Sequence, residues 1–254
     1  MDLSNHNIQL YAQISLIAYN TPSGEVLNVF TTDLSLNIKK AFFLSSVHDA
    51  QLYTLLLDDC VIFALRGTES ITDIKSDINF LKDPFQDIIY SNNVDYKKWK
   101  DIQVHQGFLK QYNSIKYNII ATIYGQLWKN KDTIKRIVFV GHSLGGGLAT
   151  LGAAHVKALL GKEAEVECYT YGSPRIGNNK FRCFFDENVD ISVRCVNGCD
   201  IVTKIPTLNY YHVKGLCEVG NKEQNIFKKI FGNINDHVIS NYITSISEKI
   251  NIKD

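Results

Sequence analysis

The chain changes its hydrophobic period along its length. Near the amino terminus, Leu10, Ile14 and Ile17 recur at helical spacing after Asn and Ser residues, which predicts a helix over Ile8–Tyr19. Farther along, short apolar runs rich in β-branched residues are bounded by turn residues, which is typical of strands. The expected strands are Ala41–Val47, Gln51–Leu57, Val61–Leu65, Ile137–Val140, Val166–Tyr171, Ile191–Val196 and a tyrosine-rich strand near Tyr210.

The order of these strands predicts the fold class. The first three follow one another through tight turns, as antiparallel strands do, whereas the later ones alternate with helical patterns. We therefore expect an α/β fold with a central mixed, mostly parallel sheet flanked by helices. The chain shows no repeat and no linker, so we expect a single domain over residues 1–254. The later helices are expected from Val104–Phe108 to near Trp128, near Asn178–Glu187 and near His237–Ile250.

One strand-to-helix junction carries candidate chemistry. The run Ile137–Val140 leads directly into Gly-His-Ser-Leu-Gly at positions 141–145, and a helix of small residues follows. A serine between a buried strand and a helix, with glycines around it, is the arrangement of a nucleophile elbow. The Ser143 hydroxyl would project above the sheet beside the backbone N–H of Leu144, at the positive end of the helix. A glycine-rich turn without chemistry is the alternative.

A serine nucleophile needs a histidine base, and the histidine needs a carboxylate to orient it. In this fold class the chain order is serine, acid, histidine, and His155 in the helix after the elbow points away. His212 lies in a strand-like run, whereas His237 lies where a loop meets a helix, a common place for catalytic residues. We expect His237 to be the base, with His212 as the alternative.

Asp200 is the expected acid. It follows the strand Ile191–Val196 through an Asn-Gly-Cys turn, and catalytic groups of open α/β sheets gather beyond the carboxyl ends of strands. Asp186 and Asp190, which flank a helix end, are the alternatives. Asp236 is interpreted as the cap of the last helix, because adjacent side chains point in different directions and His237 is its neighbour.

Composition limits the partners and the cellular location that we expect for this protein. The formal net charge of +1 argues against a nucleic-acid partner. No apolar run is long enough to span a membrane, and the first residues lack the regions of a signal peptide, so we expect a cytoplasmic or intracellular protein. The six cysteines are then expected to be reduced thiols. An alternative is a metal site with ligand spacing in the zinc range, formed by Cys195, Cys199, His212 and Cys217.

With these residues placed, the chain resembles the class 3 (fungal-type) triacylglycerol lipase family of α/β-hydrolases, from about Ala41 to Tyr242. Leu-Arg-Gly-Thr at 65–68 is similar to the family's F-R-G-[ST], and Gly-His-Ser-Leu-Gly-Gly at 141–146 matches without change. Leucine replaces the usual aromatic residue in the first motif, and Thr203 stands where proline is common. The other matching segments are 104–108, 169–178, 196–206 and Asp236-His237 followed by Tyr242.

The resemblance implies a serine carboxylic ester hydrolase, above all a lipase acting on acylglycerols or related lipid esters. It implies a triad of Ser143, His237 and Asp200, an acyl-enzyme, and Thr68 as the second oxyanion contact opposite the Leu144 N–H. It also implies that Arg66 and His105 are structural. No metal or organic cofactor enters this chemistry. The alternatives are another acyl substrate (phospholipid, monoacylglycerol or a soluble ester) and a non-catalytic lipase-like binding protein.

The resemblance further places a short lid-like insertion at about residues 69–101. Its polar helical stretch Ser70–Phe80 has Ile71, Ile74 and Ile78 on one face and charges on the other, and an irregular segment follows over Pro84–Asp101. Because the helical stretch is short, charged and without tryptophan, we expect weak interfacial activation and a preference for shorter or more soluble esters. At most peripheral contact with a lipid surface is expected. The alternative is an ordinary surface helix.

Overall fold

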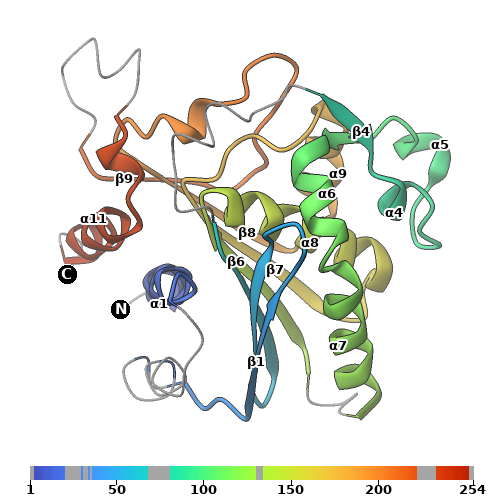
Figure 1. The fold of residues 1–254 in the computed structure, drawn as a ribbon, viewed down its shortest axis with the longest axis horizontal. Coiled ribbons are helices and arrows are strands. Elements are labelled where there is room, and N and C mark those ends of the chain that lie inside the picture. Colours follow the sequence, from blue (N-terminus) through green and yellow to red (C-terminus); the bar gives the residue numbers. More distant parts are fainter. Residues whose placement is uncertain are drawn as a thin grey trace.

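A central β-sheet runs through the molecule, and helices cover both of its faces (Figure 1). In the computed structural model, the described residues are 3–20, 30, 34, 36–67, 81–129, 134–221 and 233–251. Their seven-stranded sheet has the order β1-β2-β3-β6-β7-β8-β9. The strands are β1 Lys40–Ser45, β2 Gln51–Leu56, β3 Cys60–Leu65, β6 Arg136–His142, β7 Glu165–Tyr171, β8 Ile191–Asn197 and β9 Leu216–Val219.

The strand directions confirm the expected fold class. β1, β2 and β3 pair antiparallel, whereas β3, β6, β7, β8 and β9 pair parallel. Parallel strands need cover on both faces, and every residue of β6 from Ile137 to His142 is buried. The helices that provide this cover are α1 Leu3–Ile17, α6 Gln106–Asn113, α7 Lys116–Lys129, α8 Leu144–Leu160, α9 Asn179–Asn188 and α11 Ile239–Asn251.

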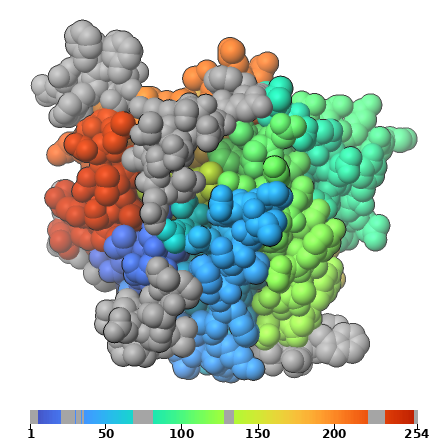
Figure 2. All heavy atoms as spheres, viewed as in Figure 1, coloured from blue at the N-terminus to red at the C-terminus, as the bar shows by residue number. Residues whose placement is uncertain are grey.

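The helices divide between the two faces of the sheet. Helices α6 to α9 pack on the face that Ile137 and Phe139 enter, and α1 and α11 pack on the face of Val138 and Val140. The first and last helices lie side by side, blue beside red in Figures 1 and 2. The two ends of the described chain therefore meet on one face. None of the helices in the described part of the chain is long and apolar enough to cross a membrane.

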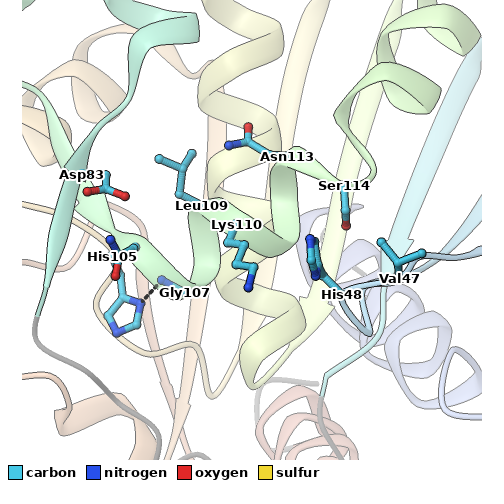
Figure 3. Close-up of a pocket in the computed structure, with 10 residues that line it drawn as sticks. Val47, His48, Asp83, His105, Gly107, Leu109, Lys110, Asn113 and Ser114 are labelled. Carbon is cyan, nitrogen blue, oxygen red and sulfur yellow. Dashed lines mark hydrogen bonds between the residues drawn. The ribbon is translucent and has the colours of Figure 1, made fainter.

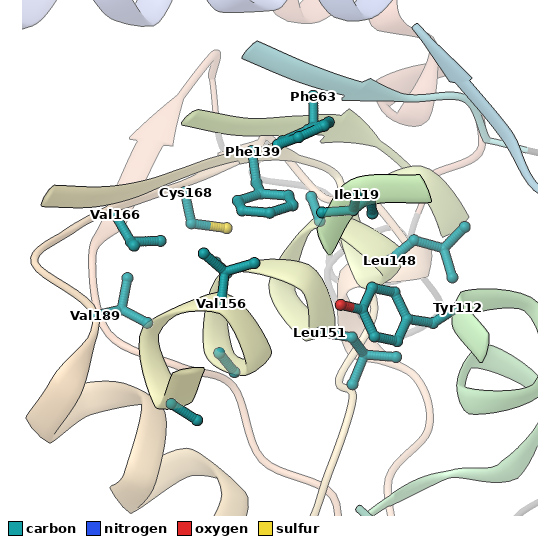
Figure 4. Close-up of a cluster of buried hydrophobic side chains, with 14 of the residues drawn as sticks. Phe63, Tyr112, Ile119, Phe139, Leu148, Leu151, Val156, Val166, Cys168 and Val189 are labelled. Carbon is teal, nitrogen blue, oxygen red and sulfur yellow. The ribbon is translucent and has the colours of Figure 1, made fainter. Parts of the chain in front are cut away.

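An aromatic stack fills the face covered by α8. Phe63 of β3 and Phe139 of β6 are neighbours in register, with ring centroids 5.1 Å apart and planes at 25° (Figure 4). Gly152 of α8 lies over this stack, and a Cβ there would approach the Phe139 ring to 2.5 Å. The small residues of α8 therefore let the helix lie close against the strand that precedes it.

Two expected elements differ from the structure. The expected long helix from 104 to 128 is broken into α6 and α7, and a strand, β5 Gln103–His105, precedes it. At the break, the Ser114 hydroxyl donates to the Gln111 carbonyl at 2.6 Å and competes with the helical ladder. The expected strand near Tyr210 is wrong: within the described residues, Tyr211 forms an isolated bridge with Gly177.

The segment expected to be irregular contains short elements. Strand β4 Lys82–Pro84 pairs with β5, and the helices α4 Gln86–Ile89 and α5 Tyr96–Trp99 follow it. Asp95 caps α5 by accepting from the Lys97 N–H at 2.9 Å. The helical stretch Ser70–Phe80, expected as a lid, lies outside the described residues.

The substitution Phe139→Ala should lower the free energy of unfolding by about 3–5 kcal/mol, because it empties a fully buried ring site that neighbouring strands cannot collapse to fill. Phe42→Ala is the control, since Phe42 is 53% exposed on the edge strand β1. Its effect should stay within about 0.5 kcal/mol. Urea unfolding monitored by circular dichroism measures both, and equal losses would contradict this packing.

Candidate active site

Ser143 stands in a strained turn between β6 and α8. Its backbone has φ 58° and ψ −128°, a region that residues other than glycine rarely enter. Glycines make room for the turn: a Cβ on Gly145 would lie 2.8 Å from the carbonyl carbon of Arg66, and one on Gly141 would lie 2.7 Å from the Gly146 nitrogen. The structure therefore has the strand–turn–helix geometry that the glycine-serine run predicts.

Three side chains from distant parts of the chain form one hydrogen-bonded line. His237 Nε2 lies 2.8 Å from Ser143 Oγ, and His237 Nδ1 lies 2.8 Å from Asp200 Oδ2. Each of the three residues is buried, with at most 1% exposure. Because a carboxylate only accepts hydrogen bonds, the imidazole hydrogen lies on Nδ1, and Nε2 accepts from the Ser143 hydroxyl. The structure thus brings the predicted serine, histidine and aspartate together.

Two further donors hold the Asp200 carboxylate. The Tyr242 hydroxyl of α11 donates to Oδ2 at 2.6 Å, and the Val202 N–H donates to Oδ1 at 2.8 Å. Burial, and then the charge of Asp200, raise the pKa of Tyr242 well above its ordinary value, so the phenol remains a donor. Both carboxylate oxygens therefore have partners in a site without solvent exposure. The sequence placed Tyr242 in a motif but did not show that it reaches Asp200.

Gly172, directly after β7, leaves space for the Asp200–His237 pair. Its φ is +62°, and a Cβ there would lie 2.8 Å from Asp200 Oδ2 and 2.9 Å from His237 Nδ1. Any side chain at this position would displace one of the two groups. Sequence reasoning assigned Gly172 no role at the site, although its place immediately after a buried strand was a visible signal.

A second histidine lies beside the line without belonging to it. His142 Nε2 is 2.6 Å from the backbone oxygen of His237, and the two rings are 4.6 Å apart. Burial, and then the neighbouring His237, lower the pKa of His142 to about 3. The ring is therefore neutral at physiological pH, and its Nε2 hydrogen donates to the carbonyl oxygen.

The alternative base and acids have other partners. His212 Nε2 donates to the Thr203 carbonyl at 2.6 Å. Asp186 accepts from the backbone N–H of residue 214 at 2.6 Å, and Asp190 accepts from that of residue 166 at 2.8 Å. These side chains therefore stabilise loops and strand ends away from His237.

Asp236 does not act as expected. Its carboxylate accepts from the Cys199 N–H at 2.7 Å and from Asn233 Nδ2 at 2.8 Å, in place of capping the last helix. Cys199 immediately precedes Asp200, so Asp236 fixes the turn that presents the acid. The sequence could not show this because the two residues lie far apart along the chain.

The oxyanion side of the site is described in part. Leu144 begins α8, so its N–H belongs to the first turn of the helix, next to Ser143. Thr68 lies outside the described residues. Gly67 directly before it is described, and a Cβ on Gly67 would lie 2.7 Å from the His142 carbonyl oxygen and 3.2 Å from Ser143 Cβ. Gly67, the last described residue directly after β3, therefore packs against the nucleophile turn.

His105 lines an open pocket, which Figure 3 shows. His105 Nδ1 accepts from the Gly107 N–H at 3.1 Å and so caps α6, a structural role like the one the sequence suggested. The pocket beside it has a volume of about 760 Å³ and is lined by His48, Asp83 and Lys110 among others. None of its lining residues belongs to the Ser143–His237–Asp200 line.

The alternative metal site does not form. Among the described residues, no three His, Cys, Asp or Glu side chains gather closely enough to hold a metal ion. Cys195 and Cys217 are partners in register on β8 and β9, while His212 is engaged by a carbonyl. None of the six cysteines, all of which lie in the described part of the chain, forms a disulfide in the structure.

The sheet order and the buried line at a nucleophile elbow are those of an α/β-hydrolase. The sequence profile of the lipase (class 3) family matches residues 62–210, more than half of the chain. The chain therefore belongs to the class 3 lipase family, as the motifs predicted. Ser143 and Asp200 lie inside the matched segment, and His237 lies beyond it.

Individual relatives match over parts of their length. Secreted mono- and diacylglycerol lipase 1 of Fusarium solani is 35% identical over 41% of this chain and 30% of its own. Phospholipase A1-II 1 of Oryza sativa subsp. indica is 30% identical over 59% of this chain and 40% of its own. The chain thus spans less than half the length of these relatives.

A solved structure shares the fold. It is a deletion mutant of Rhizomucor miehei lipase in complex with its propeptide, and it superposes with a TM-score of 0.72. The superposition covers 93% of this chain and 78% of the other, at 20% sequence identity. At this identity the likeness supports the α/β-hydrolase architecture.

The expected cytoplasmic or intracellular location is wrong. The Fusarium solani relative, at 35% identity, is named as a secreted protein. The expectation rested on the composition of the first residues. That composition was therefore a poor guide.

Histidine burial makes stability depend on pH. Burial lowers the pKa of His155 to about 4, against 6.5 in an unfolded chain; nearby Asp87 opposes this shift and Lys116 adds to it. Between these two pH values, His155 binds a proton in the unfolded state but not in the folded state. The free energy of unfolding should therefore fall as pH drops from about 6.5 to about 4. One such proton corresponds to about 1.4 kcal/mol per pH unit.

The variant His155→Gln isolates this contribution. Its free energy of unfolding, measured by urea titration at several pH values, should fall less steeply below pH 6.5 than that of the parent protein. Parallel pH profiles for the two proteins would contradict the inference that His155 is neutral in the fold.

Proposed function

We propose that this chain is a serine carboxylic ester hydrolase that acts on lipid esters, acylglycerols above all. The observation that carries the proposal is the buried line Ser143–His237–Asp200 at a strained elbow, in a chain of the class 3 lipase family. A hydroxyl bonded to an imidazole that is itself oriented by a carboxylate is the arrangement of an activated nucleophile. The complete line weighs against a protein that only binds lipid.

Acylation begins at Ser143. Its oxygen attacks the ester carbonyl carbon while His237 Nε2 takes the hydroxyl proton, and Asp200 stabilises the imidazolium through Nδ1–H. The carbonyl oxygen becomes an oxyanion that faces the Leu144 N–H at the start of α8, with Thr68 proposed as the second donor. Each such donor contributes about 3 kcal/mol to lowering the barrier. The carbon–oxygen bond to the alcohol then breaks as His237 returns its proton to the leaving oxygen.

Deacylation repeats these steps with water. His237 takes a proton from a water molecule, whose oxygen attacks the acyl carbon. As the tetrahedral intermediate collapses, the bond from the acyl carbon to Ser143 Oγ breaks and His237 returns the proton to Oγ, which releases the carboxylic acid and restores the hydroxyl. Burial of all three residues strengthens the electrostatic interactions on which both halves depend. No step calls for a metal or an organic cofactor.

A second candidate function is hydrolysis of phospholipid acyl esters. It is favoured by the relative from Oryza sativa, which is named a phospholipase A1 and is 30% identical over 59% of this chain. The triad chemistry is the same for both substrate classes, so the head group is decided outside the Ser143–His237–Asp200 line. A panel of acylglycerols and phospholipids of matched acyl chains separates the two candidates by their kcat/KM values.

The variants Ser143→Ala and His237→Gln should each lower kcat toward p-nitrophenyl butyrate by about a million-fold, because the members of such a line act as one unit. Asp200→Asn should lower it by about 10,000-fold through loss of the correct tautomer. Initial rates from released p-nitrophenol measure these losses.

The rejected alternatives supply matched controls. His212→Gln and Asp186→Asn change the same residue types away from the line, and they should retain kcat within a few-fold of the parent protein. If His212→Gln abolished turnover while His237→Gln did not, the assignment of the base would be wrong.

We further propose a single domain with a short lid-like insertion at about 69–101, and at most peripheral contact with a lipid surface. With such a lid, hydrolysis of tributyrin should rise smoothly as its concentration passes the solubility limit, and short-chain esters should be preferred over emulsified triolein. A pH-stat assay measures both. A sharp jump in rate at the solubility limit would contradict weak interfacial activation.

A further inference from the structure

Tyr19, near the amino terminus, contacts the turn that holds Ser143. It lies in the turn after α1, before the segment that the family profile matches. Its hydroxyl is 2.8 Å from His142 Nδ1, and the two rings lie 5.8 Å apart. His142 directly precedes Ser143, so a side chain of the first helix region contacts the elbow itself.

The direction of each hydrogen bond in this contact is determined. The His237 carbonyl oxygen can only accept, so the hydrogen of the neutral His142 ring lies on Nε2, 2.6 Å from that oxygen. His142 Nδ1 is therefore an acceptor, and the Tyr19 hydroxyl must be the donor. Burial raises the pKa of Tyr19, which keeps the phenol protonated in this role.

The Tyr19 oxygen also meets the turn that leaves β3. Gly67, one residue before Thr68 in the chain, lies directly against it. Gly67 has no side chain, and a Cβ there would collide with the Tyr19 oxygen. The Arg66 guanidinium lies 5.7 Å from the centre of the Tyr19 ring and donates to Gln51 at 2.8 Å. Residues of the turn after β3 therefore pack against the Tyr19 side chain.

We propose that Tyr19 is a positioning residue of the active site. Its hydroxyl packs against Gly67 in the turn after β3 and donates to His142, and His142 connects the nucleophile turn to the backbone of His237. The donors run in one sequence: Tyr19 O–H to His142 Nδ1, and His142 Nε2–H to the His237 carbonyl. The inference rests on the proposed function, because it concerns how that site is held.

Tyr19 should affect the chemical step more than substrate binding. The groups that it connects are the nucleophile turn, the base and the start of the oxyanion loop, and their relative placement matters most in the transition state. A small displacement of such groups lowers kcat strongly while the ground-state contacts of the ester persist.

The test compares Tyr19→Phe with Tyr53→Phe. Tyr53 is the matched control, because its hydroxyl donates to the Asn20 carbonyl at 3.0 Å in the same turn after α1, whereas the Tyr19 hydroxyl donates to His142. With p-nitrophenyl butyrate, Tyr19→Phe should lower kcat about ten-fold with KM within two-fold. Tyr53→Phe should leave both within two-fold. Equal effects of the two variants, or a change confined to KM, would overturn the proposal.

A second comparison, made in a variant of His142, tests whether the effect of Tyr19→Phe on kcat depends on His142. The variant His142→Gln can still donate to the His237 carbonyl but lacks an acceptor at the Nδ1 position. Adding Tyr19→Phe to it should change kcat less than two-fold, since the contact is already lost. A further ten-fold loss in the double variant would show that Tyr19 acts without His142 and would contradict the relay.

A spectroscopic measurement separates this proposal from the proposed function. The ¹⁵N resonance of His142 Nδ1 should shift in Tyr19→Phe toward the value of an acceptor without a partner, and it should not shift in Tyr53→Phe. This readout needs no turnover. If no ester is hydrolysed but the resonance shifts, the proposed function fails and the hydrogen-bonded contact stands; an unshifted resonance overturns the positioning role by itself.

Discussion

The strained turn at Ser143 is the constraint on which the rest of the structure depends. A residue with a side chain held at φ 58° costs about 1–3 kcal/mol, and it persists only where its surroundings fix it. Here they do: the strand before it is buried on both faces, and α8 is anchored by its own small residues against the sheet. Glycines at 141 and 145 let the new helix and the chain leaving β3 approach the turn within van der Waals contact. The strained turn that presents the Ser143 hydroxyl to His237 is therefore supported by the centre of the fold.

Asp200 and His237, which line up with that hydroxyl, come from two separate segments of the chain. Asp200 follows β8 through a turn fixed by Asp236, and His237 arrives from the segment before α11. Tyr242, one turn into α11, donates to Asp200, and Asn241 of the same helix donates to the Asn235 carbonyl, two residues before His237. Because α1 packs beside α11, both ends of the described chain support the site from one face of the sheet.

The interior around Ser143, His237 and Asp200 contains polar groups that are paired in hydrogen bonds. Asp200 has three hydrogen-bond donors on its two carboxylate oxygens, and His142 is neutral with a partner on each ring nitrogen. In a medium of low polarity each of these bonds is stronger than in water, and each missing partner would be correspondingly costly. Such a network holds the groups in place without need for solvent.

The sequence by itself determined what depends on neighbours along the chain. Local hydrophobic period predicted the α/β class and most strands, and the glycines around Ser143 predicted the elbow because that turn needs them within a few residues. Chain order and loop position then selected His237 and Asp200. The break between α6 and α7, the absence of a strand at Tyr210, the bond of Asp236 to Cys199 and the roles of Gly172, Tyr242 and Tyr19 were decided by tertiary structure. The Ser114 hydroxyl at the helix break also lies 2.8 Å from the Ser46 hydroxyl. In the other cases too, the contacting group comes from a distant part of the sequence, so no local pattern encodes it.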